Sequence, residues 1–310
     1  MSNASVGGDS PSVAVVGGNG FIGSRIARSF TEKGWKTAVF TRADPLVEEG
    51  GALSDRITSS CGAIIWAATQ NTPATAAADP RNAAAELAEV QRTLAHVKHA
   101  FPDIHVVFLS SGGTVYADRE APHVEDEGLM PATPYACLKV DLENLFLDFA
   151  HSTILRISNA YGPGQTGTRS QGVLAHWLRA IATGNAIHVY GNLETERDYI
   201  YVDDIARAVY AVIAHRAEDL PKAVFNVGSG SATSLKKLLE IVLSVTGANV
   251  SVVHDNSRGF DLNSSCLDIT AIRKATGWTP RVLLPEGIER MWKWIQQVES
   301  VAGSAGSRVR

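Results

Sequence analysis

Two residues suited to proton exchange, Tyr135 and Lys139, stand four positions apart in the segment Tyr135-Ala-Cys-Leu-Lys139. On a helix this spacing places both side chains on one face, and Pro134 suits the first position of such a helix. A free tyrosine has a pKa of about 10, too high for ready proton exchange at neutral pH. Because a nearby cation favours the phenolate, Lys139 is predicted to lower the pKa of Tyr135. The pair predicts acid and base catalysis.

A glycine-rich turn, Gly17-Gly18-Asn19-Gly20-Phe21-Ile22-Gly23, follows the apolar run 13–16. Glycines allow a tight turn and a close approach of the backbone to a pyrophosphate, while N–H groups at the start of the next helix face the phosphates. The alternative is a glycine-rich turn that binds nothing. In this context the motif predicts a nicotinamide dinucleotide site and a redox enzyme, with the oxidised nicotinamide as a second positive charge near Tyr135. The predicted contacts are Gly17, Asn19, Gly20, Phe21, Ile22 and Gly23.

The residues after the second predicted strand, Thr41 and Arg42, bear on the choice of dinucleotide. An NAD-binding protein usually places an acid here, which accepts hydrogen bonds from the adenosine ribose. A hydroxyl and a guanidinium instead suit the additional phosphate of NADP. We therefore expect NADP, with NAD as the alternative, and Arg42 as the main determinant. The competing interpretation of Arg42 is a solvated side chain at a strand end.

These residues are expected to lie on alternating strands and helices. Short apolar runs predict strands, and apolar residues at helical spacing predict helices. The alternation predicts an α/β fold of the Rossmann type, with a doubly wound parallel sheet and a smaller C-terminal substrate-binding lobe. The stretch 41–62 is too short for a complete helix, strand and helix, so one unit is shortened. The predicted strands are 13–16, 37–40, 63–66 and 105–109, and the predicted helices are 22–33, 87–101, 173–183, 203–214 and 234–246.

The chain divides into two predicted domains between disordered tails at 1–10 and 303–310. Residues 11–165 form the dinucleotide-binding domain, to which the segment at about 196–230 returns. Residues 166–302 form mainly the substrate-binding lobe. This organisation places the substrate between the two parts.

Composition argues for a small-molecule ligand. The net charge is -4, from 28 basic and 32 acidic residues, with no basic stripe for a nucleic acid or an anionic membrane. No run approaches the roughly 20 apolar residues of a membrane helix, and the start lacks the features of a secretory signal.

The chain offers no evident metal site or disulfide framework. His96 and His99 lack a third ligand, so no metal is expected. The three cysteines form no CxxC pair. A reducing cytoplasm fits best.

Together these motifs resemble the extended short-chain dehydrogenase/reductases, and within them the nucleotide-sugar epimerase/dehydratase family typified by UDP-galactose 4-epimerase. The resemblance runs in order from about Val13 to Trp294. It includes Trp66-Ala67-Ala68, Ser110-Ser-Gly-Gly-Thr-Val-Tyr116, 156–165, Tyr190-Gly191, 197–204, 225–230 and 277–280.

The resemblance implies roles for particular residues. Tyr135 becomes the acid and base that exchanges a proton with the sugar, and Lys139 holds the nicotinamide ribose. Ala67 and Ala68 join Thr41, Arg42, Tyr135 and Lys139 in the cofactor site. Asn159, Arg197 and Arg258 contact the diphosphate side of a UDP- or dTDP-linked sugar nucleotide. A homodimer formed through a helix pair is also common in such proteins.

One position departs from the family. Gly112 stands where a catalytic Ser or Thr is usual, which leaves Thr114 and Ser111 as candidates for the third catalytic residue. At the next two positions Gly113 and Thr114 replace the Asp-Glu pair of sugar-nucleotide 4,6-dehydratases. Dehydration is therefore not expected, because it would lack an acid and a base.

Three functions fit these residues. The first is epimerisation at sugar C4 through a 4-keto intermediate, and the second is one-way reduction of a 4-keto sugar nucleotide by NADPH. The motif set favours the epimerase, whereas Thr41 and Arg42 favour the reductase. The third is a catalytically silent cofactor sensor. The presence of Tyr135 and Lys139 argues against this function, and Gly112 argues for it.

Overall fold

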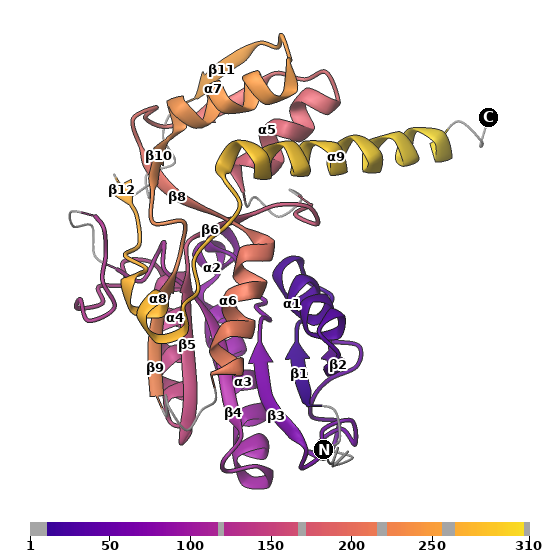
Figure 1. Ribbon diagram of the computed structural model, residues 1–310, viewed down its shortest axis with the longest axis vertical. Coiled ribbons are helices and arrows are strands. Elements are labelled where there is room, and N and C mark those ends of the chain that lie inside the picture. Colours follow the sequence, from indigo (N-terminus) through magenta and orange to yellow (C-terminus); the bar gives the residue numbers. More distant parts are fainter. Residues whose placement is uncertain (1–10, 117–120, 167–171, 216–221, 256–263, 307–310) are drawn as a thin grey trace, which may run out of the picture.

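The structure is a computed structural model that describes residues 11–116, 121–166, 172–215, 222–255 and 264–306 (Figure 1). The predicted N-terminal tail, the end of the C-terminal tail at 307–310 and Arg258 lie outside these residues. Helix α9 (Leu284–Gly306) continues into the predicted C-terminal tail.

A six-stranded parallel sheet forms the larger part of the molecule, with strand order β2-β1-β3-β4-β5-β9. Its strands are β1 (Ser12–Val16), β2 (Lys36–Phe40), β3 (Cys61–Trp66), β4 (His105–Ser111), β5 (His151–Ile157) and β9 (Lys222–Val227). The predicted doubly wound α/β fold is confirmed. The last strand, β9, follows the lobe segments in the chain and pairs with β5.

Helices cover both faces of this sheet, which is why its strands are apolar runs rather than alternating ones. On one face α1 (Phe21–Glu32) and α6 (Val202–Ala214) pack on a core that includes Ile26, Phe30 and Val209. On the other face α3 (Pro80–Ala100) and α4 (Pro134–Leu147) cover Phe108 and Ile154. The short helices are α2 (Pro73–Ala78) and α8 (Thr270–Thr276).

The predicted shortened unit lies between β2 and β3. Residues 41–60 form neither a helix nor a strand. A bridge between Val47 and Leu53 closes a turn in which Gly50 and Gly51 have positive φ angles. This turn stands between β2 and β3 in place of a full helix and strand.

The smaller lobe lies beyond the carboxyl ends of the sheet strands (Figure 1). Its core joins α5 (Val173–Ala182), α7 (Leu235–Thr246) and α9, with the strands β7 (Ile187–Tyr190) and β11 (Val252–Asp255). A second sheet stands between the lobe and the main sheet, formed by β6 (Asn159–Tyr161), β8 (Glu196–Tyr201), β10 (Ala232–Ser234) and β12 (Ser264–Ser265). In the described part of the chain no helix is long and apolar enough to cross a membrane.

Candidate active site

The glycine turn connects β1 to α1 at the carboxyl edge of the sheet. Gly17 has φ +82°, and a Cβ there would lie 2.7 Å from the backbone nitrogen of Ala68. Gly20 donates its N–H to the carbonyl of Gly17 at 2.9 Å, and a Cβ on Gly23 would overlap that carbonyl oxygen. Glycine is therefore required for the turn itself and for its contact with the loop after β3. This backbone leaves the N-terminus of α1 open to a pyrophosphate.

A cavity of about 1210 Å³ extends from this turn along the end of β2. Thr41 and Arg42 both line it, as do Asn19, Ala67 and Ala68. Most of the residues that the sequence assigned to the cofactor line this cavity, whereas Gly23, Tyr135 and Lys139 do not. The shape and donor set fit a dinucleotide, because backbone N–H groups, small residues and a guanidinium share one cavity.

Arg56, which the sequence interpretation missed, fixes the loop next to Arg42. Its Nη2 atom donates to Asp44 Oδ1 at 2.7 Å, and its Nη1 atom donates to the Val39 carbonyl at 3.0 Å. Asp44 in turn donates its backbone N–H to Thr41 Oγ1 at 3.2 Å. The local carboxylate of Asp44 is therefore engaged by Arg56, while Arg42 lines the cavity.

Tyr135 and Lys139 lie on one face of α4, as their spacing predicts. Thr133 caps this helix by accepting the N–H of Ala136 at 3.1 Å, and Pro134 is its first residue. Both side chains are buried, with 8% of Tyr135 and 3% of Lys139 exposed. Lys139 Nζ lies 5.5 Å from the centre of the Tyr135 ring. Among the described residues no carboxylate makes a direct ion pair with this ammonium.

A second cavity, of about 1150 Å³, joins these two residues to the lobe. It shares Phe21, Ala67 and Ala68 with the dinucleotide cavity, so the two cavities adjoin. Its floor is formed at the ends of β4 and β5, and its roof comes from α5, β7 and β8. A ligand in this cavity lies between the catalytic pair and the lobe.

Burial controls the proton affinities of both residues. It lowers the pKa of Lys139 to about 8, although the carboxylates of Glu86 and Glu143 act in the opposite direction. It raises the pKa of Tyr135, and Glu86 adds to that effect, whereas a hydrogen bond with Ser111 opposes it. The lowered pKa that the sequence predicted for Tyr135 is therefore wrong for the protein alone, because desolvation of the phenolate dominates. A bound positive nicotinamide would act in the opposite direction.

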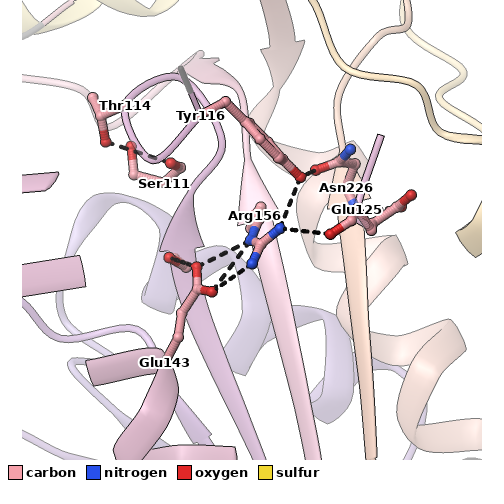
Figure 2. Close-up of polar contacts among 8 residues, drawn as sticks. Ser111, Thr114, Tyr116, Glu125, Glu143, Arg156 and Asn226 are labelled. Carbon is pink, nitrogen blue, oxygen red and sulfur yellow. Dashed lines mark hydrogen bonds and ion pairs between the residues drawn. The ribbon is translucent and has the colours of Figure 1, made fainter. Parts of the chain in front are cut away.

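The surroundings of Gly112 leave no room for a side chain at the position where the family usually carries the third catalytic hydroxyl. A Cβ on this residue would lie 2.6 Å from Leu267 Cδ1 and 3.0 Å from the Arg156 carbonyl oxygen. Ser111 and Thr114 both line the cavity, and Ser111 is the one that opposes the rise in the pKa of Tyr135. The Thr114 hydroxyl donates to the Ser111 carbonyl at 3.4 Å (Figure 2).

Two predicted substrate residues, Asn159 and Arg197, line the lobe side of the same cavity. Asn159 Nδ2 donates to the Asp198 carbonyl at 3.0 Å, and Arg197 Nη1 donates to the Glu196 carbonyl at 2.7 Å. The third, Arg258, falls outside the described residues. Between Asn159 and Arg197 the buried Asp198 accepts N–H groups from Ser229 and Leu267, which ties β8 to two loops.

The sequence interpretation missed further polar residues around this cavity. His176 and Arg179 line it from α5, and His188 and Tyr190 line it from β7. Their signal was a polar face at helical spacing on α5 and alternation on β7. None of the described lining residues is an Asp or Glu, so the cavity suits an anion.

Glu86 is another residue that the sequence interpretation missed. Only 2% of it is exposed, and its Oε2 atom accepts the backbone N–H and the Nδ2 of Asn71 at 2.9 and 2.8 Å. It lines the dinucleotide cavity. In the sequence it is one of two acids, with Glu89, on an amphipathic helix, and nothing local distinguishes it.

No group of His, Cys, Asp and Glu in the described ranges is arranged to hold a metal ion. His96 lies against Gly51 at the edge of the dinucleotide cavity. Asp203 and Asp204 begin α6, as predicted, and Asp204 accepts the N–H groups of Arg281 and Val282.

A doubly wound parallel sheet, a glycine turn between β1 and α1, and a Tyr-Lys pair on α4 beneath a smaller lobe define an extended short-chain dehydrogenase/reductase. Residues 13–228 match the model of the NAD dependent epimerase/dehydratase family, and the chain belongs to this family. The predicted family and its nicotinamide dinucleotide are thereby confirmed.

The chain is similar to enzymes of two kinds. It is 34% identical over 196 residues to a dTDP-4-dehydro-6-deoxyglucose reductase of Escherichia coli, a match that covers 62% of this chain and 61% of the relative. It is 36% identical over 194 residues to a UDP-glucose 4-epimerase of Mycolicibacterium smegmatis, covering 60% of each chain. The matched part is thus about three fifths of the length of these relatives.

A solved structure extends the likeness over almost the whole chain. The UDP-glucose 4-epimerase of Thermotoga maritima with UDP-glucose has a TM-score of 0.78 and 25% sequence identity, covering 93% of this chain and 99% of that chain.

Proposed function

We propose that the protein is an NAD(P)-dependent nucleotide-sugar oxidoreductase, and specifically a sugar-nucleotide 4-epimerase. The observation that carries this proposal is a pair of adjoining cavities, one lined by the glycine turn and the other by Tyr135, Lys139 and Arg197. The cavity on the substrate side is lined by Tyr135 as acid and base and by three cations, Lys139, Arg179 and Arg197. None of its described lining residues is a carboxylate. That combination suits a diphosphate carrying a sugar with a reactive hydroxyl.

Tyr135 is the proton acceptor and donor in this proposal. Its phenolate takes the proton of the C4 hydroxyl as the C4 hydrogen leaves as hydride, so that C4 becomes a ketone. After the ketone turns over, Tyr135 returns the proton as hydride arrives on the opposite face. The dinucleotide, when bound, accepts and returns that hydride. Both transfers require groups held about 3–3.5 Å from the reacting carbon.

Lys139 and Ser111 adjust Tyr135 for this task. The Lys139 ammonium binds the ribose hydroxyls of the nicotinamide nucleoside, and its positive charge favours the phenolate. The Ser111 hydroxyl bonds the phenol and the sugar oxygen. Ser111 is favoured over Thr114 because it opposes the rise in the pKa of Tyr135, whereas the Thr114 hydroxyl donates to a backbone carbonyl.

The diphosphate is proposed to lie beside Arg197 and Asn159, with Arg258 joining from outside the described residues. Arginine suits this role through bidentate hydrogen bonds to phosphate. Arg179 and His188 extend the basic lining toward the lobe.

Reduction of a 4-keto sugar nucleotide by NADPH is the second candidate. Thr41 and Arg42 at the adenosine end favour it, since NADPH is the usual exchanging reductant. The same Tyr135 would then donate its proton once. A catalytically silent sensor is less well supported, because Ser111 supplies the hydroxyl that Gly112 lacks.

The partners proposed are a UDP- or dTDP-linked sugar and a second copy of the chain in a homodimer, without nucleic acid or membrane. We place the enzyme in the cytoplasm, where its three free cysteines stay reduced.

The test is incubation of the purified protein with UDP-glucose, UDP-galactose and dTDP-4-keto-6-deoxyglucose, with NADPH supplied to the keto sugar. A C4 epimer formed without net NADPH consumption supports the epimerase, and stoichiometric consumption supports the reductase. Tyr135→Phe should abolish either reaction, whereas Tyr210→Phe, which changes a phenol packed against Phe30 and Trp35, should not. Turnover that survives Tyr135→Phe, or none with a panel of UDP- and dTDP-sugars, would overturn the proposal.

A further inference from the structure

A row of buried polar residues crosses the sheet beneath the catalytic pair. Ser110, Arg156 and Asn226 are direct neighbours in the registers of β4, β5 and β9. All three are buried. Glu143 from α4 joins this row one helical turn beyond Lys139 (Figure 2).

The Glu143 carboxylate bridges the two strands that carry the site. Its Oε1 atom accepts the Ser110 hydroxyl at 2.5 Å. Its Oε2 atom accepts Arg156 Nη2 at 2.8 Å, and Arg156 Nε donates to both oxygens at 3.2 Å. Glu143 is 2% exposed and Arg156 is 4% exposed. Both strands are thus fastened to α4 by one carboxylate.

The other end of Arg156 reaches the segment after β4. Its Nη1 atom donates to Tyr116 Oη at 3.0 Å and to the Glu125 carbonyl at 3.1 Å. The Tyr116 phenol donates in turn to Asn226 Oδ1 at 2.6 Å. The segment 111–116, which contains both candidate hydroxyls, is therefore held at its start through Ser110 and at its end through Tyr116 (Figure 2).

This arrangement bears directly on Ser111. Side chains alternate between the two faces of a strand. The hydrogen bond from Ser110 to Glu143 therefore holds Ser110 on the face covered by α4, and Ser111 leaves the strand toward the opposite face. A buried ion pair is weak evidence for stability, because apolar residues of similar volume often serve a fold as well. The polar row instead connects the element that carries Tyr135 with the strand end that carries Ser111.

We propose that Glu143 is a positioning residue, which acts through Ser110 to hold the end of β4 that carries Ser111 in place relative to Tyr135 on α4. Its effect on rate rests on the proposed function, whereas its effect on the position of Ser111 does not. The negative charge of Glu143 also favours the ammonium form of Lys139, which is a separate effect from the positioning of Ser111.

The test is a double-mutant cycle in whichever of the two reactions the protein catalyses. Ser110→Ala removes the link to Glu143 while leaving the Glu143–Arg156 pair, so it avoids an unpaired buried charge. We expect kcat to fall about 10- to 100-fold, as for a small misplacement of a reacting group, with KM nearly unchanged. In the Ser111→Ala background the same change should lower kcat less than about twofold, because residues that act as one unit are not additive. Glu143→Gln should follow the same pattern.

A matched control separates this role from a purely structural one. Asp204→Asn alters another buried carboxylate, which binds backbone N–H groups far along the chain from α4. It should lower stability with the same small effect on kcat in both backgrounds. If Ser110→Ala lowers kcat by the same factor with and without Ser111, the positioning role is wrong.

A crystal structure of Ser110→Ala gives a readout that needs no substrate. The Ser111 hydroxyl should move relative to the Tyr135 phenol, and an unchanged position would overturn the proposal. If no sugar nucleotide reacts with the wild-type protein, the proposed function fails, while this structural comparison still decides the role of Glu143.

Discussion

The side chain of Leu267 fills the space that a side chain on Gly112 would need. A Cβ on Gly112 would lie 2.6 Å from Leu267 Cδ1, and the buried Asp198 carboxylate accepts the Leu267 N–H. The space for the hydroxyl that the family usually carries at this position is therefore filled by Leu267, which lies just after β12. The neighbouring Ser111 is the residue proposed to supply this hydroxyl instead.

Restoring the usual hydroxyl should fail. Gly112→Ser is expected to lower the free energy of unfolding by about 1–3 kcal/mol, the usual cost of overpacking, without raising kcat. Gly113→Ser is the matched control for stability, because the nearest atoms to a Cβ there are 3.9 Å away. Urea unfolding of both variants checks this, and equal stabilities would contradict the described packing.

Ser111 and Thr114 should differ in their effect on rate. Ser111→Ala is expected to lower kcat on the order of 100-fold, as when one donor to a developing oxyanion is removed. Thr114→Val should have a much smaller effect, since the Thr114 hydroxyl donates to a backbone carbonyl. Steady-state kinetics with whichever sugar nucleotide of the test panel reacts will distinguish the two variants. A larger loss in Thr114→Val would transfer the role to Thr114.

Lys139 should destabilise the protein when no dinucleotide is bound. Burial lowers its pKa from 10.5 to about 8. Between these values the unfolded chain holds a proton that the folded protein lacks, so stability rises with pH across this window, and the full cost is present below about pH 8. Lys139→Met should therefore be more stable than wild type at pH 7, and the difference should shrink toward pH 10.

Urea unfolding at both pH values measures this effect. Lys236→Met, at an exposed lysine on α7, should show no such pH-dependent difference. A constant difference between Lys139→Met and wild type at all pH values would be inconsistent with the buried ammonium.

Arg42 should determine the preference for NADP. Arg42→Ala is expected to weaken NADP binding about tenfold or more, through the loss of a charge-assisted hydrogen bond, and to leave NAD binding nearly unchanged. Isothermal titration with each dinucleotide measures the ratio. Arg28→Ala serves as a control, because Arg28 pairs with Glu32 on the exposed side of α1. If both dinucleotides lose affinity equally, Arg42 does not read the additional phosphate.

Glu86 should set the pH range of activity. Its negative charge raises the pKa values of both Tyr135 and Lys139, so Glu86→Gln should move the pH profile of kcat to lower pH. The glutamine oxygen can still accept the Asn71 N–H groups. Glu89→Gln changes an exposed acid on the same helix and should leave the profile in place. A profile unchanged in Glu86→Gln would show that this carboxylate does not act on the catalytic pair.

Most of the sheet was predictable because its signals are local. Apolar runs of strand length and the glycine turn define β1 and α1 without reference to distant residues. The shortened unit before β3 also followed from chain length alone. The lobe was harder to predict, because its strands β7 and β11 are short and pair across a long stretch of sequence.

The sequence by itself determined the reactive pair and the dinucleotide turn. Tyr135 and Lys139 meet because helical geometry brings positions four apart onto one face, and the glycines form the turn because their own backbone permits it. Only the tertiary structure decided how that site is completed. Leu267 closes the place beside Gly112, Glu86 reaches the catalytic pair from α3, and Glu143 binds two strands at once. These contacts join residues far apart in the chain, and local sequence carries no record of them.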